Sequence, residues 1–177
     1  RDLLKIQVNL KDQLLVEGSF SSVDKLYGIA KDFLTNDENS EKYPEFKVRT
    51  LEEARLQVQS WQQVYDAAEV NSPEQIAAEK KLEDWQDRLT TLKAIGEPSF
   101  REISKMAVMT IDMDNKSSYG RYIEILSELQ AAQNDLRDEY SLKYFGVKFT
   151  ELDETDDADK ILAIQTIVPQ RIVKKEK

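Results

Sequence analysis

Apolar and polar residues alternate over the first ten positions of the chain. The apolar residues of this run are Leu4, Ile6, Val8 and Leu10. A period of two residues is typical of a strand with one buried face. We therefore expect a strand here and, after a tight turn, a returning strand through Leu14 and Val16. A helix that ends at Gly18 is the alternative, but the β-branched side chains in the run favour the pair of strands.

A helix with one apolar face is predicted next. Ser21 or Ser22 can cap its first turn, and apolar residues then recur every three or four positions,. This face consists of Val23, Leu26, Ala30 and Phe33, with Tyr27 and Leu34 beside it. The polar stretch 35–42 is expected to form a loop, and Phe46 and Val48 belong to a brief strand.

Two amphipathic helices with a short break between them form the most informative pattern in the chain. Thr50 and Glu53 make a capping box, so the first helix begins directly after Thr50. Ser72 and Pro73 supply an N-cap and a proline at the first helical position, and Gly96 ends the second helix. The apolar residues are Leu51, Ala54, Val58, Trp61, Tyr65 and Ala68 in the first helix and Ala78, Leu82, Trp85, Leu89 and Leu92 in the second.

These two helices are predicted to fold back on each other. If the chain reverses at residues 71–73, their apolar positions face each other level by level, with Trp61 opposite Trp85 and small residues meeting near the turn. The spacing is that of heptads. We therefore predict an antiparallel coiled-coil hairpin with arms of about 20 residues, each about 30 Å long.

A further capping box is present at Ser99 and Glu102. It predicts a short helix through Ile103, Met106 and Ala107.

A long helix is expected from about Tyr119 to Phe145, with Gly146 as its left-handed C-cap. Residues at heptad spacing form a seam along it, and we assign this seam to partner binding. The seam consists of Tyr119, Tyr122, Leu126, Leu129, Gln133, Leu136 and Tyr140. Gln133 either fixes the register of an association or faces water at a wet edge. The helix either lies along the hairpin in a three-helix bundle or leaves its seam open for a partner.

The last part of the chain begins with an acidic block. Six acidic residues and no basic residue lie between positions 151 and 159, before an apolar cluster at 161–168. Carboxylates are favourable in the first turn of a helix, so a helix is expected here. The β-branched residues of the cluster make a strand the alternative.

Together these elements predict a mainly α-helical chain with a minor α+β component. Its main parts are the antiparallel coiled-coil hairpin and the long third helix. A small β element comes from the N-terminus, residues 45–49 and residues 147–152. We expect three segments, which are a small ββα-like N-terminal segment (1–49), a helical hairpin and long-helix bundle (50–146) and a C-terminal tail (147–177).

Composition excludes several classes of chemistry. The 177 residues include 25 Lys and Arg, 34 Asp and Glu, no His and no Cys, and the net charge is −9. Without His and Cys the chain cannot form the usual zinc, blue-copper or iron–sulfur sites, or a Ser-His-Asp triad. An acidic chain is a poor ligand for nucleic acid, and no apolar run reaches the length of a membrane span. We therefore expect no catalytic residue, cofactor or metal site, no nucleic-acid partner and no membrane span.

Three short motifs have weak specificity. Ser22 and Lys25 match the Ser-x-x-Lys of penicillin-recognising enzymes, but the partner motifs are absent and a helix cap is the better interpretation. Calcium loops beginning at Asp112 or Asp153 would lack the glycine and the final acidic ligand. A loose cation site in the acidic block is a minor alternative.

The sequence therefore predicts a non-catalytic helical interaction or scaffold subunit of a larger assembly, which binds partner proteins or itself through its heptad seams. The alternative is an acidic inhibitor or assembly chaperone, for example of a phage or conjugation system, that binds a basic partner protein through residues 151–159 and nearby acidic faces. An enzyme using carboxylates alone is a third hypothesis and requires two acids in one pocket. A cytoplasmic location is expected unless a signal segment before Arg1 has been removed.

Overall fold

The computed structural model of the chain describes residues 1–114 and 116–175. The chain is 53% helical and 17% strand, with a five-stranded mixed sheet and a two-stranded sheet. The fold is therefore α+β, and the prediction of a mainly α-helical hairpin and bundle is wrong. Residues 176 and 177 of the expected tail lie outside the described residues.

The chain forms two compact units, each built from separate stretches of sequence. Unit 1 contains Arg1–Phe46, Ile103–Glu139 and Val168–Lys177, and unit 2 contains Lys47–Glu102 and Tyr140–Ile167. One helix and one pair of strands run from one unit into the other.

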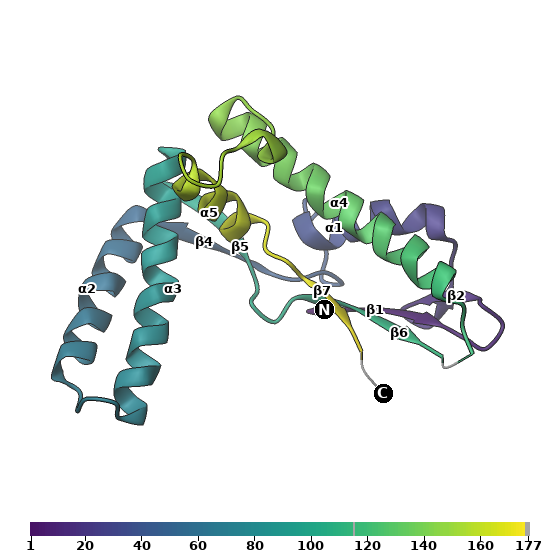
Figure 1. Cartoon of the computed structure of the whole chain (residues 1–177), viewed down its shortest axis with the longest axis horizontal. Helices are drawn as coiled ribbons and strands as arrows, with labels where there is room; N and C mark the ends of the chain where they lie inside the picture. Colours follow the sequence, from purple (N-terminus) through teal and green to yellow (C-terminus); the bar gives the residue numbers. More distant parts are fainter. Residues whose placement is uncertain (115, 176–177) are drawn as a thin grey trace. The chain divides into compact units, whose positions relative to one another are not determined.

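Unit 1 contains the five-stranded sheet, in the order β3-β2-β1-β6-β7 (Figure 1). The strands are β1 (Leu3–Val8), β2 (Leu14–Val16), β3 (Ser19–Phe20), β6 (Val108–Met113) and β7 (Ile172–Lys174). β1 and β2 are antiparallel, with Ile6 opposite Val16 and Val8 opposite Leu14. This confirms the predicted strand pair at the N-terminus. β6 lies between β1 and β7 and is parallel to both.

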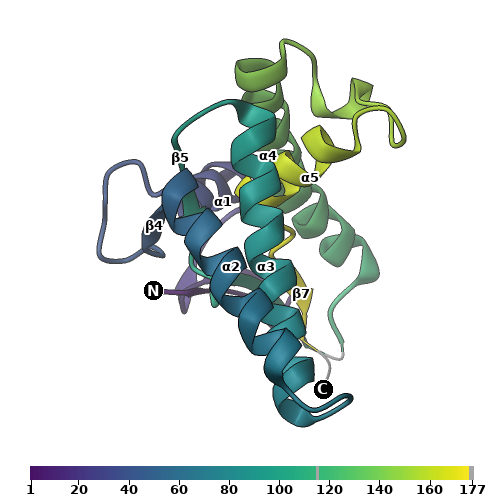
Figure 2. The same ribbon diagram turned by 90° about the vertical axis from the view of Figure 1, so that its left-hand side faces the viewer.

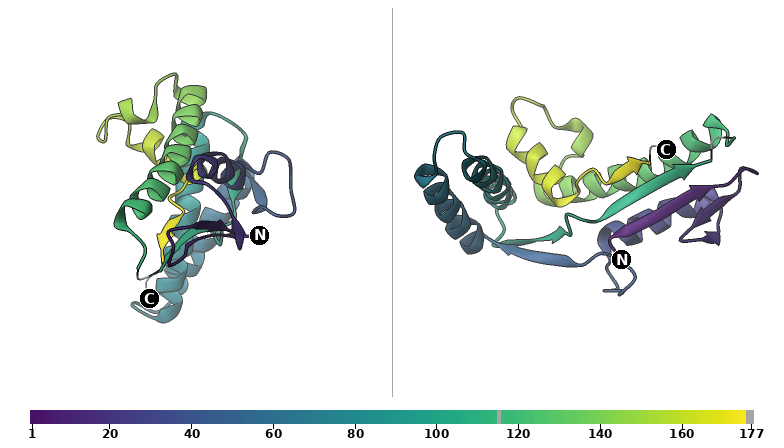
Figure 3. Two further views of the ribbon diagram at one scale, coloured as in Figure 1. Left: turned by 90° about the vertical axis from the view of Figure 1, so that its right-hand side faces the viewer. Right: turned by 90° about the horizontal axis from the view of Figure 1, so that it is seen from below.

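One face of this sheet is covered by helices. η1 (Val23–Lys25) leads into α1 (Leu26–Thr35), and α1 and the long helix α4 (Tyr119–Phe145) lie over the same face, whereas the other face is open in the view from below (Figure 3). The side chains on the covered face are buried, among them Leu4, Ile6, Val8, Leu14, Met109 and Ile111. Alternate residues such as Lys5 and Thr110 are half-buried. The predicted bounds of α4 are confirmed.

Polar contacts join α1 to α4. The Tyr27 hydroxyl donates to Asp135 at 2.8 Å, and the Lys31 ammonium pairs with Glu139 at 2.6 Å. The apolar face of this part of α4 is buried within unit 1. The prediction that α4 forms a three-helix bundle with the hairpin is therefore wrong for this part of the helix, because its apolar residues cover the sheet of unit 1.

Unit 2 is organised around the predicted hairpin of α2 (Leu51–Ala67) and α3 (Pro73–Ile95), which pack side by side (Figure 2). Both helices begin at the predicted caps. The Thr50 hydroxyl accepts from the Glu53 amide, and the Ser72 hydroxyl accepts from the Gln75 amide, both at 3.1 Å. The last helix, α5 (Ala158–Ile167), packs against α3, so the apolar cluster after the acidic block is helical and not a strand.

Two local predictions near the ends of unit 2 are wrong. Residues expected as a helix from Ser99 form β5 (Ser99–Ile103), which pairs with β4 (Phe46–Thr50), and Ala107 directly precedes β6. The carboxylate of Glu102 binds side chains of other elements and does not cap a helix. The strand expected at 147–152 is instead the short 3-10 helix η2 (Phe149–Glu151).

The sheet core gives a direct stability prediction. Ile6 and Ile111 face each other across β1 and β6, and both are fully buried. Ile111→Ala should lower the free energy of unfolding by about 2–5 kcal/mol, because it removes buried methyl groups and leaves a cavity. Leu10→Ala is the control, since Leu10 is 59% exposed. Urea unfolding monitored by circular dichroism measures both variants, and equal losses would contradict the assignment of the core to the sheet.

Candidate functional site

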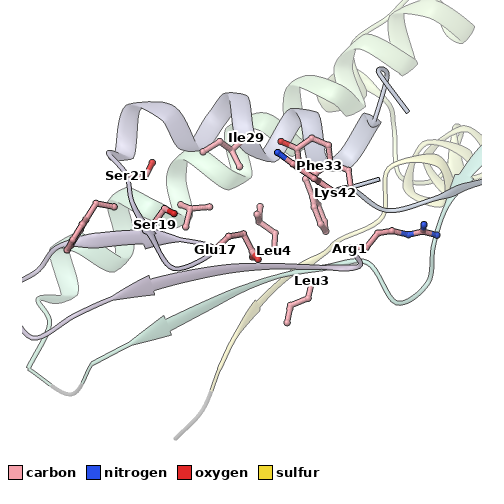
Figure 4. Close-up of a pocket in the computed structure, with 12 residues that line it drawn as sticks. Arg1, Leu3, Leu4, Glu17, Ser19, Ser21, Ile29, Phe33 and Lys42 are labelled. Carbon is pink, nitrogen blue, oxygen red and sulfur yellow. The ribbon is translucent and has the colours of Figure 1, made fainter. Parts of the chain in front are cut away.

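The candidate site is a pocket of about 590 Å³ in unit 1, between α1 and the strands β1 to β3 (Figure 4). Its volume lies within the range of ligand-binding pockets in proteins. The apolar part of the lining is formed by Leu3, Leu4, Val16, Phe20, Ile29, Phe33 and Tyr43. Polar side chains lie at its edges.

The apolar wall follows directly from the periodicities of the two elements. Alternation along β1 and β2 directs Leu4 and Val16 toward the helices,. Ile29 and Phe33 are one helical turn apart on α1 and point toward the strands (Figure 4),. Leu4 and Phe33 are buried, but Phe20 in the edge strand β3 is 72% exposed. A buried apolar floor thus has a large exposed aromatic side chain at its mouth.

The loop between α1 and β4 closes one end of the pocket. Asn36 has the left-handed φ of 42° and ends α1. Its side-chain amide donates to the Pro44 carbonyl at 2.9 Å, and its side-chain oxygen accepts from the Ser40 amide at 2.7 Å. These bonds hold the loop that carries Lys42 and Tyr43. The Tyr43 ring packs edge-on against Phe33, with centroids 6.4 Å apart.

Tyr43 is a neutral hydrogen-bond donor at neutral pH. Burial raises the pKa of its hydroxyl, and the nearby carboxylates of Asp32 and Glu38 raise this pKa further. The phenol therefore stays protonated and can donate to a ligand.

The charged groups at the edge of the pocket are mostly engaged within the protein. The Arg1 guanidinium forms an ion pair with Glu45, and the Glu17 carboxylate accepts from the Lys5 amide at 2.5 Å. Glu17 is the one carboxylate among the described residues that line this pocket, so a second acid for general acid–base work is not placed beside it. The arrangement offers apolar surface, a phenol and the exposed Lys42 ammonium for binding.

The seam assigned to partner binding is divided between surface and core. Leu129, Gln133 and Leu136 are at most 2% exposed, while Tyr119 is 75% exposed. Tyr122, Leu126 and Tyr140 are half-buried. The Gln133 side-chain amide donates to Gln170 at 2.5 Å, an internal contact of unit 1. The middle of the seam is therefore packed by the chain itself, and none of the seven residues lines the pocket.

The acidic block is organised by its own backbone. The Asp153 carboxylate accepts from the amides of Asp156 and Thr155, which lower its pKa. Asp157 pairs with Lys160 at 2.5 Å, and this hydrogen bond lowers the pKa of Asp157. These bonds are typical of a solvated turn leading into α5.

Sequence reasoning missed the residues that define the pocket mouth. Phe20 follows the expected end of the second strand, and Ile29 lies beside the apolar stripe of its helix, outside the residues assigned to it. An apolar residue next to the apolar face of a helix can indicate a binding surface, because it makes that face wider than the core requires. Tyr43 lies in a polar loop, and no pattern there indicated that it packs on Phe33.

A second polar cluster lies within unit 2 and is built around Glu102. Its carboxylate binds Arg49 at 2.6 Å and Arg88 at 2.8 Å. Both guanidinium groups also lie over the ring of Trp85, at 5.1 Å (Arg49) and 4.5 Å (Arg88) from its centroid. The sequence pattern placed Trp85 opposite Trp61 and did not predict these cation–π contacts. Glu102 and Arg88 are both buried, and their ion pair therefore joins β5 to α3 inside unit 2.

The Glu102 cluster makes unit 2 sensitive to acid. Burial acts to raise the pKa of Glu102, but the hydrogen bonds from Arg88 and Arg49 outweigh it and hold this pKa below its ordinary value of 4.5. A lowered folded-state pKa stabilises the fold above the unfolded-state pKa, and this stability is lost as pH falls through the folded-state value. Glu102→Gln should therefore cost about 3–5 kcal/mol at neutral pH, because it leaves buried guanidinium groups without a counter-charge.

Urea unfolding at pH 7 and at about pH 3 measures this effect. The difference from wild type should shrink in acid, because below the unfolded-state pKa the unfolding of the wild type is coupled to proton uptake by Glu102. Glu53→Gln is the matched control. Glu53 also pairs with Arg49, at 3.0 Å, but is more exposed, so its loss should cost less than about 1 kcal/mol. A pH-independent difference for Glu102→Gln would contradict the assignment.

Comparison with known proteins adds no constraint on this site. No protein-family model, no curated protein and no solved structure matches the chain. Among the described residues, none of the helices combines the length and the apolar composition that a membrane-spanning segment requires.

Proposed function

We propose that the chain is a non-catalytic protein-interaction subunit whose unit 1 pocket receives apolar side chains of a partner protein. The observation that carries this proposal is Phe20, a large aromatic side chain that is 72% exposed beside a buried apolar floor. Exposed apolar surface next to a cavity is typical of binding sites, and aromatic side chains are enriched among the residues that dominate binding energy.

The surroundings of the pocket support a protein partner over a small molecule. Phe20 and Ser21 also line an adjacent polar depression, which contains Lys11, Asp24 and Arg121. An apolar centre with a charged edge is the usual composition of a protein–protein interface. Small-molecule sites, in contrast, enclose most of their ligand.

The pocket fits one or two apolar side chains of the partner. Burial of each aliphatic or aromatic side chain stabilises a complex by about 1.5–3 kcal/mol. The Tyr43 hydroxyl and the Lys42 ammonium can then bind backbone carbonyls or a carboxylate at the edge. Because the loop of Asn36 already holds Tyr43, binding would require little ordering of this wall.

The exposed end of the predicted seam is a further contact surface in the proposal. The rings of Tyr119 and Tyr122 lie 6.1 Å apart, and the Lys174 ammonium lies 4.9 Å from the ring of Tyr122. Tyrosines present a large rigid area at low entropic cost. The buried residues Leu129, Gln133 and Leu136 have no such role in the proposal, because they pack within unit 1.

The proposal predicts that a charge at the pocket mouth weakens partner binding. Phe20→Asp should raise the dissociation constant at least about tenfold, because it removes an apolar contact and places a carboxylate at an apolar interface. The partner is first recovered from an extract of the source organism with the full chain and then purified. Calorimetric titration of the purified partner measures the affinities of wild type and variant.

Leu10→Asp is the matched control, since Leu10 is 59% exposed and does not line the pocket. It should bind the partner like wild type. Equal affinities of wild type and Phe20→Asp, with both proteins folded by circular dichroism, would overturn the proposed role of the pocket.

A further inference from the structure

The turn that joins α2 and α3 exposes two apolar side chains. Val70 is 75% exposed and Ile76 is 59% exposed. Within unit 2, the turn is at the end of the hairpin that lies away from β4, β5 and α5 (Figure 1). The chain therefore presents these two side chains at a tip that the described elements of its own unit do not cover.

The backbone of this turn is held by a network of hydrogen bonds. Asn71 has a left-handed φ of 62°, and its amide donates to the Gln75 side chain at 2.8 Å. The Gln75 amide donates to Ser72, and the Gln75 side chain also reaches the Tyr65 carbonyl at 3.5 Å. Val70 and Ile76 thus flank a turn that is already ordered, and ordered contacts lose less entropy on binding.

The tip is acidic. Between positions 66 and 79 there are four acidic residues and no Lys or Arg, and the next basic residues, Lys80 and Lys81, follow one turn beyond Ile76 along α3. These are Asp66, Glu69, Glu74 and Glu79, all exposed. Within the described residues none of the four has an ion-pair partner, so their negative charge is available to a binding surface.

The negative charge of the tip determines which kinds of surface can bind Val70 and Ile76 favourably. A second copy of the tip would bring carboxylates against carboxylates, which disfavours association. An anionic lipid surface is disfavoured for the same reason. A protein surface with Lys and Arg around an apolar depression satisfies both the charge and the two apolar side chains.

We propose that the α2–α3 tip is a docking site for a partner protein that has an apolar depression rimmed by Lys and Arg. Val70 and Ile76 enter the depression, and the four carboxylates pair with its basic rim. The tip uses none of the residues that line the pocket of unit 1, so the two binding surfaces are tested independently.

Site-specific photo-cross-linking tests the proposal in the full chain. A benzophenone amino acid replaces Ile76, or Leu56 as a control with the same 59% exposure on α2. On irradiation in cells of the source organism, the residue at position 76 should cross-link to a segment of another protein that is rich in Lys and Arg. The residue at position 56 should not give this product. Mass spectrometry of the cross-linked peptides identifies the segment.

Charge and apolar variants then separate the two parts of the interaction. The double variant Glu69→Lys and Glu74→Lys should abolish the cross-link at position 76. Val70→Ser with Ile76→Ser should weaken binding of the purified partner at least about tenfold, while Leu56→Ser leaves it unchanged. Raising the salt concentration from about 0.05 to 0.5 M should also weaken binding, because exposed charges are screened.

Several outcomes would overturn the proposal. These are no product at position 76, a product with a second copy of the chain or with lipid, and a product that persists in the charge-reversed variant. All substituted positions are exposed, and unchanged circular dichroism spectra establish that the variants are folded.

Discussion

The parallel pairing of β1 with β6 is the interaction on which unit 1 depends. Six residue pairs, from Leu3 with Val108 to Val8 with Met113, join stretches that are separated in sequence by all the elements from β2 to β5. Parallel strands cannot be joined by a tight turn and need a long crossover. Once paired, β1 and β6 form the centre of the sheet, with β2 and β7 on either side. Their buried side chains provide the apolar surface that α1 and α4 cover.

Sequence patterns within a segment predict the secondary structure of most segments of this protein. They fail where contacts with residues far away in the sequence determine the structure. The alternation of apolar and polar residues correctly predicted β1 and β2, and the capping residues Thr50 and Ser72 correctly predicted the two helices of the hairpin. At Ser99 the same capping signal was misleading, because Glu102 is bound by Arg49, 53 residues away, and by Arg88, 14 residues away. Heptad spacing in α4 shows that the helix has an apolar face. It does not show whether that face is covered by the chain's own sheet or by a partner.

The candidate binding surfaces were harder to predict because each combines side chains from separate elements. The pocket takes Phe20 from an edge strand, Ile29 from a helix and Tyr43 from a loop. Only the folded register brings them together. The pocket and the hairpin tip have one feature in common. In both, apolar side chains lie next to a turn whose backbone is hydrogen-bonded to a polar side chain, which is Asn36 at the pocket and Gln75 at the tip. Asn36 and Gln75 cannot be distinguished from other polar turn residues in the sequence, because they bind backbone groups and no sequence motif indicates which ones.

The long crossover between β1 and β6 also has a consequence for biosynthesis. Ribosomes add about 5–20 residues per second, so β1 to β3 leave the ribosome several seconds before β6 is available to pair with them. The α2–α3 hairpin is made of contacts between neighbouring segments, which form quickly, and it can be complete during this interval. The first strands of unit 1 must therefore wait for β6, and the α2–α3 hairpin of unit 2 is translated between them and can fold while they do.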